Sequence, residues 1–125
     1  MYSIKFYKDK NGKEPVKDYL STLGKKKDKD SRLNFNKIRD YIKILSQHGT
    51  RAGEPFVKHI DGKIWELRLL RNRILFFGYD GNNFILLSHF IKKTNKTPQR
   101  EIEKAKQLMT DYIERSENNE KLWWI

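Results

Sequence analysis

Three apolar runs between residues 63 and 98 constrain the fold more than any other part of the chain. The runs at 64–70, 73–79 and 84–91 are rich in Ile, Leu, Phe, Trp and Tyr, the residue types that favour strands. Arg71-Asn72 separates the first two runs, and Asp80-Gly81 begins the break before the third. Asn and Asp-Gly tolerate the positive φ that tight hairpins require. The segment therefore predicts three consecutive antiparallel strands.

The flanking segments predict one further strand and three helices. Residues 2–7 alternate as a short strand does, and the apolar spacing predicts helices over 15–23 and 31–48, separated by the charged linker 25–30. Residues 49–61 are expected to be loop, with at most a short extended piece at 56–60. Thr97 is expected to cap a last helix that begins at Pro98 and ends near residue 114.

The resulting order, β-α-α-β-β-β-α, predicts an α+β fold: a small, mostly antiparallel sheet with two N-terminal helices and a C-terminal helix packed on one face. The N-terminal strand is expected to pair with a later strand across the two helices. With 125 residues, we expect a single domain over 1–115 and a C-terminal tail over 116–125. The tail is polar up to residue 121 and ends in Leu122-Trp123-Trp124-Ile125, which is expected to fold back onto the domain rather than present an apolar peptide to a partner.

A net charge of +11 on a chain of this size favours a polyanionic partner, either nucleic acid or an acidic protein. A basic protein with no such partner is the alternative. The chain has no cysteine, which excludes disulfides and suits the reducing cytoplasm. No apolar run approaches the ~20 residues that span a bilayer. The three histidines show no metal-ligand spacing, and no cofactor motif is present, so we expect no metal and no cofactor.

The cations concentrate in and around the predicted strands. Residues 58–100 contain nine Lys or Arg against three acids. Side chains alternate along a strand, so Glu66 and Arg68 share one face. A two-residue turn at 71–72 would pair Leu70 with Arg73 and place Arg68 and Arg73 diagonally on that face. Two guanidiniums there suit phosphate, which they bind bidentately; the alternative is that both pair with Glu66 and with acids on the helices.

A second basic group follows the last strand. Lys92, Lys93 and Lys96 lie with Thr97 before the predicted helix, whose N-terminus favours anions. A solvated basic loop is the alternative. The cations expected to extend the RNA-binding surface at the ends of the strands are Lys58, Lys63 and Arg71.

Cleavage of RNA would need a base, an acid and cations for the phosphate oxygens. Glu66 is a candidate base, and His89 is a candidate acid or base or, alternatively, a packed strand histidine. The residues alone therefore support a nucleic-acid-binding α+β domain in which RNA cleavage is one outcome.

Two stretches carry a family resemblance. IWELRLLRNRILFF and FILLSHFIKKTNKTPQREIEKA resemble the HigB-like branch of the RelE/ParE toxin superfamily, with the likeness strongest over residues 55–113. The resemblance implies a toxin of a type II toxin–antitoxin system, acting in the cytoplasm as a metal-independent, ribosome-dependent mRNA endonuclease. It also implies a cognate HigA-like antitoxin of the helix-turn-helix type.

By position, the resemblance implies that Arg68 and Arg73 contact the scissile phosphate and that the lysines at 92, 93 and 96 form the family's basic segment. Glu66 stands where some relatives have a lysine, which leaves the general base open. Two other functions remain as alternatives on the same fold: a non-catalytic toxin that inhibits gyrase, and a plain nucleic-acid-binding module.

Overall fold

The three strands predicted between residues 64 and 91 form the centre of the sheet. The computed structural model describes residues 1–123, and the side chains of residues 1–118. Each central strand pairs antiparallel with the next. They are β3 (Ile64–Leu69), β4 (Asn72–Tyr79) and β5 (Asn83–Ile91).

The turn between β3 and β4 lies one residue earlier than predicted. It consists of Leu70 and Arg71, and Asn72 already belongs to β4. Arg68 therefore pairs directly with Arg73, whereas the predicted turn placed them diagonally. The sequence favoured Asn for the positive φ, but Leu70 adopts it, with φ +56°. The predicted common face of the two arginines is nevertheless confirmed, because directly paired residues share a face.

Two outer strands complete a five-stranded sheet in the order β1-β5-β4-β3-β2. β1 (Ser3–Phe6) pairs parallel with β5, which confirms that the N-terminal strand joins a later strand across the helices. β2 (Val57–Asp61) pairs antiparallel with β3 where only a short extended piece was expected. The predicted α+β, mostly antiparallel fold is confirmed, with this edge strand added to the order.

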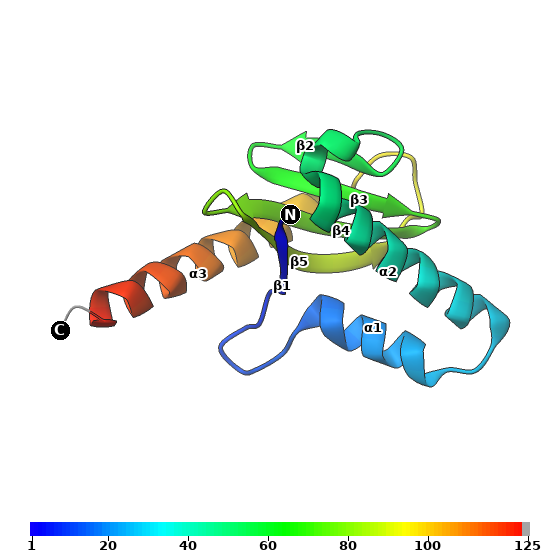
Figure 1. Ribbon diagram of the computed structural model, residues 1–125, viewed down its shortest axis with the longest axis horizontal. Helices are drawn as coiled ribbons and strands as arrows, with labels where there is room; N and C mark the ends of the chain where they lie inside the picture. Colours follow the sequence, from blue (N-terminus) through cyan, green and yellow to red (C-terminus); the bar gives the residue numbers. More distant parts are fainter. Residues whose placement is uncertain (124–125) are drawn as a thin grey trace.

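The helices cover both faces of the sheet, not one. α1 (Pro15–Lys25) and α2 (Lys29–His48) pack on the face that carries Ile74 and Phe76, whereas α3 (Gln99–Trp123) packs on the face that carries Leu75 and Phe77. Figure 1 shows α1 and α2 side by side and α3 running out beyond the sheet. All four of these β4 residues are buried, and a strand that is apolar on both sides needs cover on both sides.

Two glycines set the geometry of the helix pair. Gly24, expected to end α1, lies inside it, where an added Cβ would meet the Phe35 ring of α2 at 3.4 Å. Gly49 follows α2 with φ +63°, and a Cβ there would lie 2.8 Å from the ring of Tyr2. A short 3-10 turn, Gly49–Ala52, then leads toward β2. The glycines therefore allow close packing of α1 on α2 and of the N-terminus on the end of α2.

α3 continues without a break to Trp123, so the predicted end near residue 114 and the fraying over 116–121 are wrong. The division between a domain and a tail at residue 115 stays a prediction. Within Leu122-Trp123-Trp124-Ile125, the last two residues lie outside the described residues, as do the side chains of the first two. None of the helices within residues 1–123 has the length and apolar composition needed to cross a bilayer.

Candidate nucleic-acid interface

Two guanidinium groups share one buried carboxylate on the α3 face of the sheet. Glu66 is 3% exposed, and its Oε1 lies 3.5 Å from Nε of Arg68 and 3.7 Å from Nε of Arg73. The pairing of Arg68 with Arg73 brings both side chains out on this face. Within this group of three side chains, one negative charge faces two positive charges.

Arg73 is the fixed member of this cluster. Its side chain is 8% exposed, and its Nη1 donates to the carbonyl oxygens of Leu70 and Asn72, each at 2.8 Å. The first of these bonds stabilises the left-handed conformation of Leu70, which is costly for a residue with a Cβ. Burial lowers the pKa of Arg73, and the negative charge of Glu66 opposes that shift. Glu66 is therefore the counter-ion that offsets the cost of burying the guanidinium of Arg73.

Arg68 is the more exposed arginine of this cluster. Its side chain is 26% exposed, and its Nη1 lies 3.6 Å from a second carboxylate, Glu54, which is itself 63% exposed. The sequence analysis did not identify Glu54 as part of the site, because it lies in the segment expected to be loop. An exposed pair of this kind is weak and exchanges readily with solvent or another anion. Arg68 can therefore turn toward an incoming phosphate.

A pocket of about 320 Å³ lies beside the cluster, between β2, β3 and the loop that leads into α3. Arg68 and Glu66 line it from β3, Lys58 from β2 and Lys96 from the loop. Lys58 is the direct cross-strand partner of Glu66. Among the residues whose side chains are described, no carboxylate lies within ion-pair distance of Lys58 or Lys96. Three cations therefore line the pocket together with one carboxylate, Glu66, which already contacts both arginines. This excess of positive charge suits an anion.

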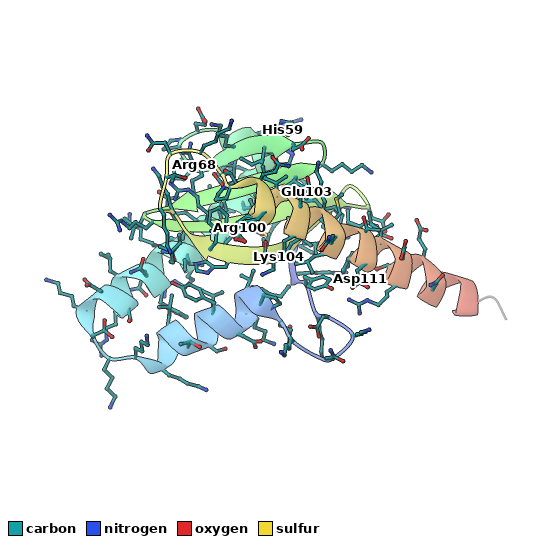
Figure 2. All side chains as sticks on the ribbon, turned by 180° about the vertical axis from the view of Figure 1, so that it is seen from behind. His59, Arg68, Arg100, Glu103, Lys104 and Asp111 are labelled. Atoms are coloured by element: carbon teal, nitrogen blue, oxygen red, sulfur yellow. The ribbon has the colours of Figure 1, made fainter. Side chains whose placement is uncertain are left out.

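The basic segment after β5 is tied to the sheet at two points. Thr97 was expected to cap a helix that begins at Pro98, but α3 begins at Gln99 and the hydroxyl of Thr97 donates to Oε2 of Glu66 at 2.7 Å. The N–H of Lys92 donates to the carbonyl of Arg71 at 2.7 Å. These bonds hold the intervening loop, with exposed Lys93 and Lys96, beside the arginine cluster. Figure 2 shows Arg68 next to this loop.

The other predicted cations lie further out. Arg71 is exposed in the β3–β4 turn, and Lys63 is exposed in the β2–β3 turn, at the opposite end of β3 from Arg68. The structure therefore brings Lys58, Lys96 and Thr97 together at the pocket but leaves Lys63 apart from it.

His89 lies on the opposite face of the sheet from Glu66. It pairs with Ile74, whose side chain packs under α1 and α2. Its ring stacks on Tyr19 with 3.6 Å between centroids, and its Nε2 lies 2.9 Å from Oδ1 of Asn72. Burial lowers the pKa of His89 from 6.5 to about 4, so the ring is neutral at pH 7. This is the packed strand histidine that the sequence left as an alternative, and it does not join the arginine cluster.

Asn72 is the centre of this second polar cluster. It is 1% exposed, accepts a hydrogen bond from the hydroxyl of Tyr19 at 2.9 Å, and donates to Oδ1 of Asn34 at 2.6 Å. Together with the contact to His89, these bonds join α1, α2, β4 and β5. Asn72 was predicted to lie in a turn, and its role in joining these four elements was not predicted. The partners lie far apart in the sequence, and no residue spacing indicates that they meet.

The arginine cluster is better equipped to bind phosphate than to exchange protons. Oε2 of Glu66 accepts from Thr97, and its Oε1 faces both arginines. A carboxylate that is 3% exposed and held between two guanidiniums and a hydroxyl orients those cations and offers a substrate little access. Within the described residues, no three His, Asp or Glu side chains gather in an arrangement that could hold a metal ion.

One family model matches the chain. The model described as "Phage derived protein Gp49-like (DUF891)" matches residues 18–110, which include α2, the strands β2 to β5 and the first part of α3. The match therefore spans the arginine cluster, the pocket beside it and the basic loop. No curated protein matches the chain. The finer resemblance to the HigB-like branch stays a prediction.

Proposed function

The chain belongs to the Gp49-like family of phage-derived proteins, a family associated with the toxins of toxin–antitoxin systems, and we propose that it is a type II toxin that acts on RNA. The observation that carries this proposal is the cationic pocket formed by Arg68, Lys58 and Lys96 over the buried pair of Arg73 and Glu66. Arg68 is held on the sheet by Glu66, so this cation needs little further ordering to bind a backbone phosphate, and the two lysines add positive charge beside it.

The proposed activity is ribosome-dependent cleavage of mRNA in the cytoplasm. In this scheme Arg68 and Lys96 stabilise the charge that develops on the phosphate oxygens, and Arg73 fixes the position of Arg68 through Glu66. Because Glu66 is only 3% exposed behind the two arginines, this scheme takes the base from the complex with the ribosome. This requirement is consistent with an enzyme that is active only there.

The proposed partner is a cognate HigA-like antitoxin of the helix-turn-helix type. A toxin encoded with its own inhibitor needs a segment that covers the surface on which RNA binds. An acidic segment that occupies Lys58, Arg68 and Lys96 would displace RNA by competing for the same charges. The family's association with toxins supports a partner of this kind.

One observation favours a second candidate, a non-catalytic toxin of the same fold. Glu66, the carboxylate in the pocket, is 3% exposed and accepts a hydrogen bond from Thr97. The described residues of the pocket therefore bind an anion better than they remove a proton. Such a protein would stop growth by occupying its target, for example gyrase, rather than by cutting RNA.

Induction of the full chain in bacteria, followed by mapping of transcript 5′ ends, tests the proposal. Wild type is expected to stop growth and to produce new 5′ ends within translated transcripts, and Arg68→Ala is expected to abolish both. Lys37→Ala, which removes an exposed cation from α2 on the other side of the sheet, is the matched control and should behave as wild type.

The other outcomes separate the candidates. Growth arrest with intact transcripts and DNA breaks favours gyrase inhibition, and arrest with neither favours binding alone. If folded Arg68→Ala still stops growth as wild type does, the arginine cluster is not the functional site.

A further inference from the structure

A second and larger pocket adjoins the first. It has a volume of about 750 Å³ and lies between the end of β5, the basic loop and the first turn of α3. Lys96 and Thr97 line both pockets, so the two are neighbours along the loop. A chain of nucleotides bound by its phosphate in the first pocket would therefore place an adjoining nucleotide at the second.

The second pocket combines an aromatic surface with cations. Phe90 and Pro98 contribute apolar surface, and Lys93 and Arg100 contribute exposed positive charge. Phe90 is the direct cross-strand partner of Arg73 and so lies on the same face of the sheet as the arginine cluster. Figure 2 shows Arg100 and Arg68 on this same side of the molecule. No described carboxylate lies within ion-pair distance of Lys93 or Arg100.

This composition matches a nucleobase better than a phosphate alone. A phosphate needs only cations and hydrogen-bond donors, which the first pocket already supplies. A splayed-out base needs a flat apolar surface to stack on, and a guanidinium or ammonium group near its edge or its adjoining phosphate. Phe90 provides that surface, and Arg100 and Lys93 provide those charges. The volume lies in the range of pockets that hold small organic ligands.

We propose that this pocket binds one base of a single-stranded RNA, stacked on Phe90, next to the phosphate held by Arg68 and Lys96. The inference rests on the proposed function and adds a position at which the sequence of the RNA can be read. Because the loop of residues 92–98 forms part of both pockets, it would set the distance between the bound phosphate and the bound base.

The test measures binding of the full chain to six-nucleotide single-stranded RNAs that carry 2-aminopurine at each position in turn. Stacking on an aromatic ring quenches this fluorescent base, so wild type is expected to quench at one position. Phe90→Leu keeps the apolar volume, removes the ring, and is expected to lose the quenching and to bind RNA roughly 10-fold more weakly. Its affinity for inorganic tripolyphosphate, which has no base, should not change.

Three further variants keep the test decisive. Phe35→Leu removes a half-buried ring between α1 and α2 and should leave the quenching intact. Phe90→Tyr retains an aromatic ring and should also retain it. Arg100→Ala changes an exposed side chain, which makes it informative even if Phe90→Leu fails to fold, and it should weaken RNA binding more than tripolyphosphate binding.

The possible results separate the two proposals. If folded Phe90→Leu and Arg100→Ala bind and quench as wild type does, the base site is wrong, while Arg68-dependent RNA binding still supports the function. If RNA binds through Arg68 without quenching at any position, the base site is again wrong. If neither RNA nor tripolyphosphate binds, both proposals fail.

Discussion

The two polar clusters on either face of β4 differ in charge. On one face, Arg73 and Arg68 share Glu66, Arg68 also pairs with Glu54, and the cluster borders a pocket whose lysines, Lys58 and Lys96, have no described carboxylate partner. On the other face, Asn72 and His89 form a neutral cluster beneath α1 and α2, with each described bond between uncharged groups. Residues 72 and 73 are neighbours in the chain, and strand alternation alone sends them to opposite environments.

The comparison shows what each kind of cluster can do. A neutral cluster whose donors and acceptors are paired needs nothing further, so it stabilises the contact between helices and sheet. A cluster with unmatched charge beside a pocket is completed only by an anion from outside. We therefore assign stability to the Asn72 side and binding to the Arg68 side, and the variants below can break that assignment.

The largest expected effect is the loss of the buried counter-ion. Glu66→Gln leaves the buried guanidinium of Arg73 without a negative charge, and should lower the free energy of unfolding by about 3 kcal/mol. Urea denaturation at pH 7 measures this. Glu54→Gln removes the exposed carboxylate beside Arg68 and should change stability by less than about 0.5 kcal/mol. Equal effects at the two positions would show that Arg73 is not buried as described.

The neutral cluster should affect stability without affecting binding. Asn72→Ala removes the shared partner of Tyr19 and His89, and should cost about 2 kcal/mol, because their polar groups are left unpaired. Tyr19→Phe removes one bond and should cost about 1 kcal/mol. Both variants, once folded, should bind single-stranded RNA as wild type does. A loss of RNA binding in folded Asn72→Ala would mean that the two faces are not separate in function.

Much of the charged side could be predicted from the sequence, because it depends on local rules. Strand alternation placed Glu66 and Arg68 on one face, and the apolar runs set the hairpin closely enough to bring Arg73 to that face. The shift of the turn onto Leu70 could not be predicted, since the side-chain bond from Arg73 to the Leu70 carbonyl across the turn is not reflected in the turn preferences of the residue types. An unfavourable local conformation was stabilised by a contact made only in the folded chain.

The neutral side and the placement of α3 were harder to predict, for different reasons. Tyr19 and His89 meet only after α1 packs on β5, and no spacing reports that contact. The cover of both sheet faces by helices, in contrast, could be predicted from residues 74–77. These four consecutive apolar residues leave neither face of the strand suited to solvent. The run was interpreted as a strand, and cover on both faces was not predicted from it.

A further expected effect, smaller than that of Asn72→Ala, is a pH dependence confined to the neutral side. Burial lowers the pKa of His89 from 6.5 to about 4, so between these values the unfolded chain binds a proton that the folded chain does not. The stabilisation is therefore fully present above pH 6.5 and is lost as the pH falls toward 4. Allowing for solvent screening of a ring that is not fully buried, we expect about 1.5 kcal/mol. Urea denaturation at pH 7 and pH 4.5 should show this excess loss in wild type relative to His89→Gln, since the carboxylates titrate alike in both. Identical pH slopes would mean that the folded chain protonates the ring as readily as the unfolded chain does, so that burial does not keep this cluster neutral.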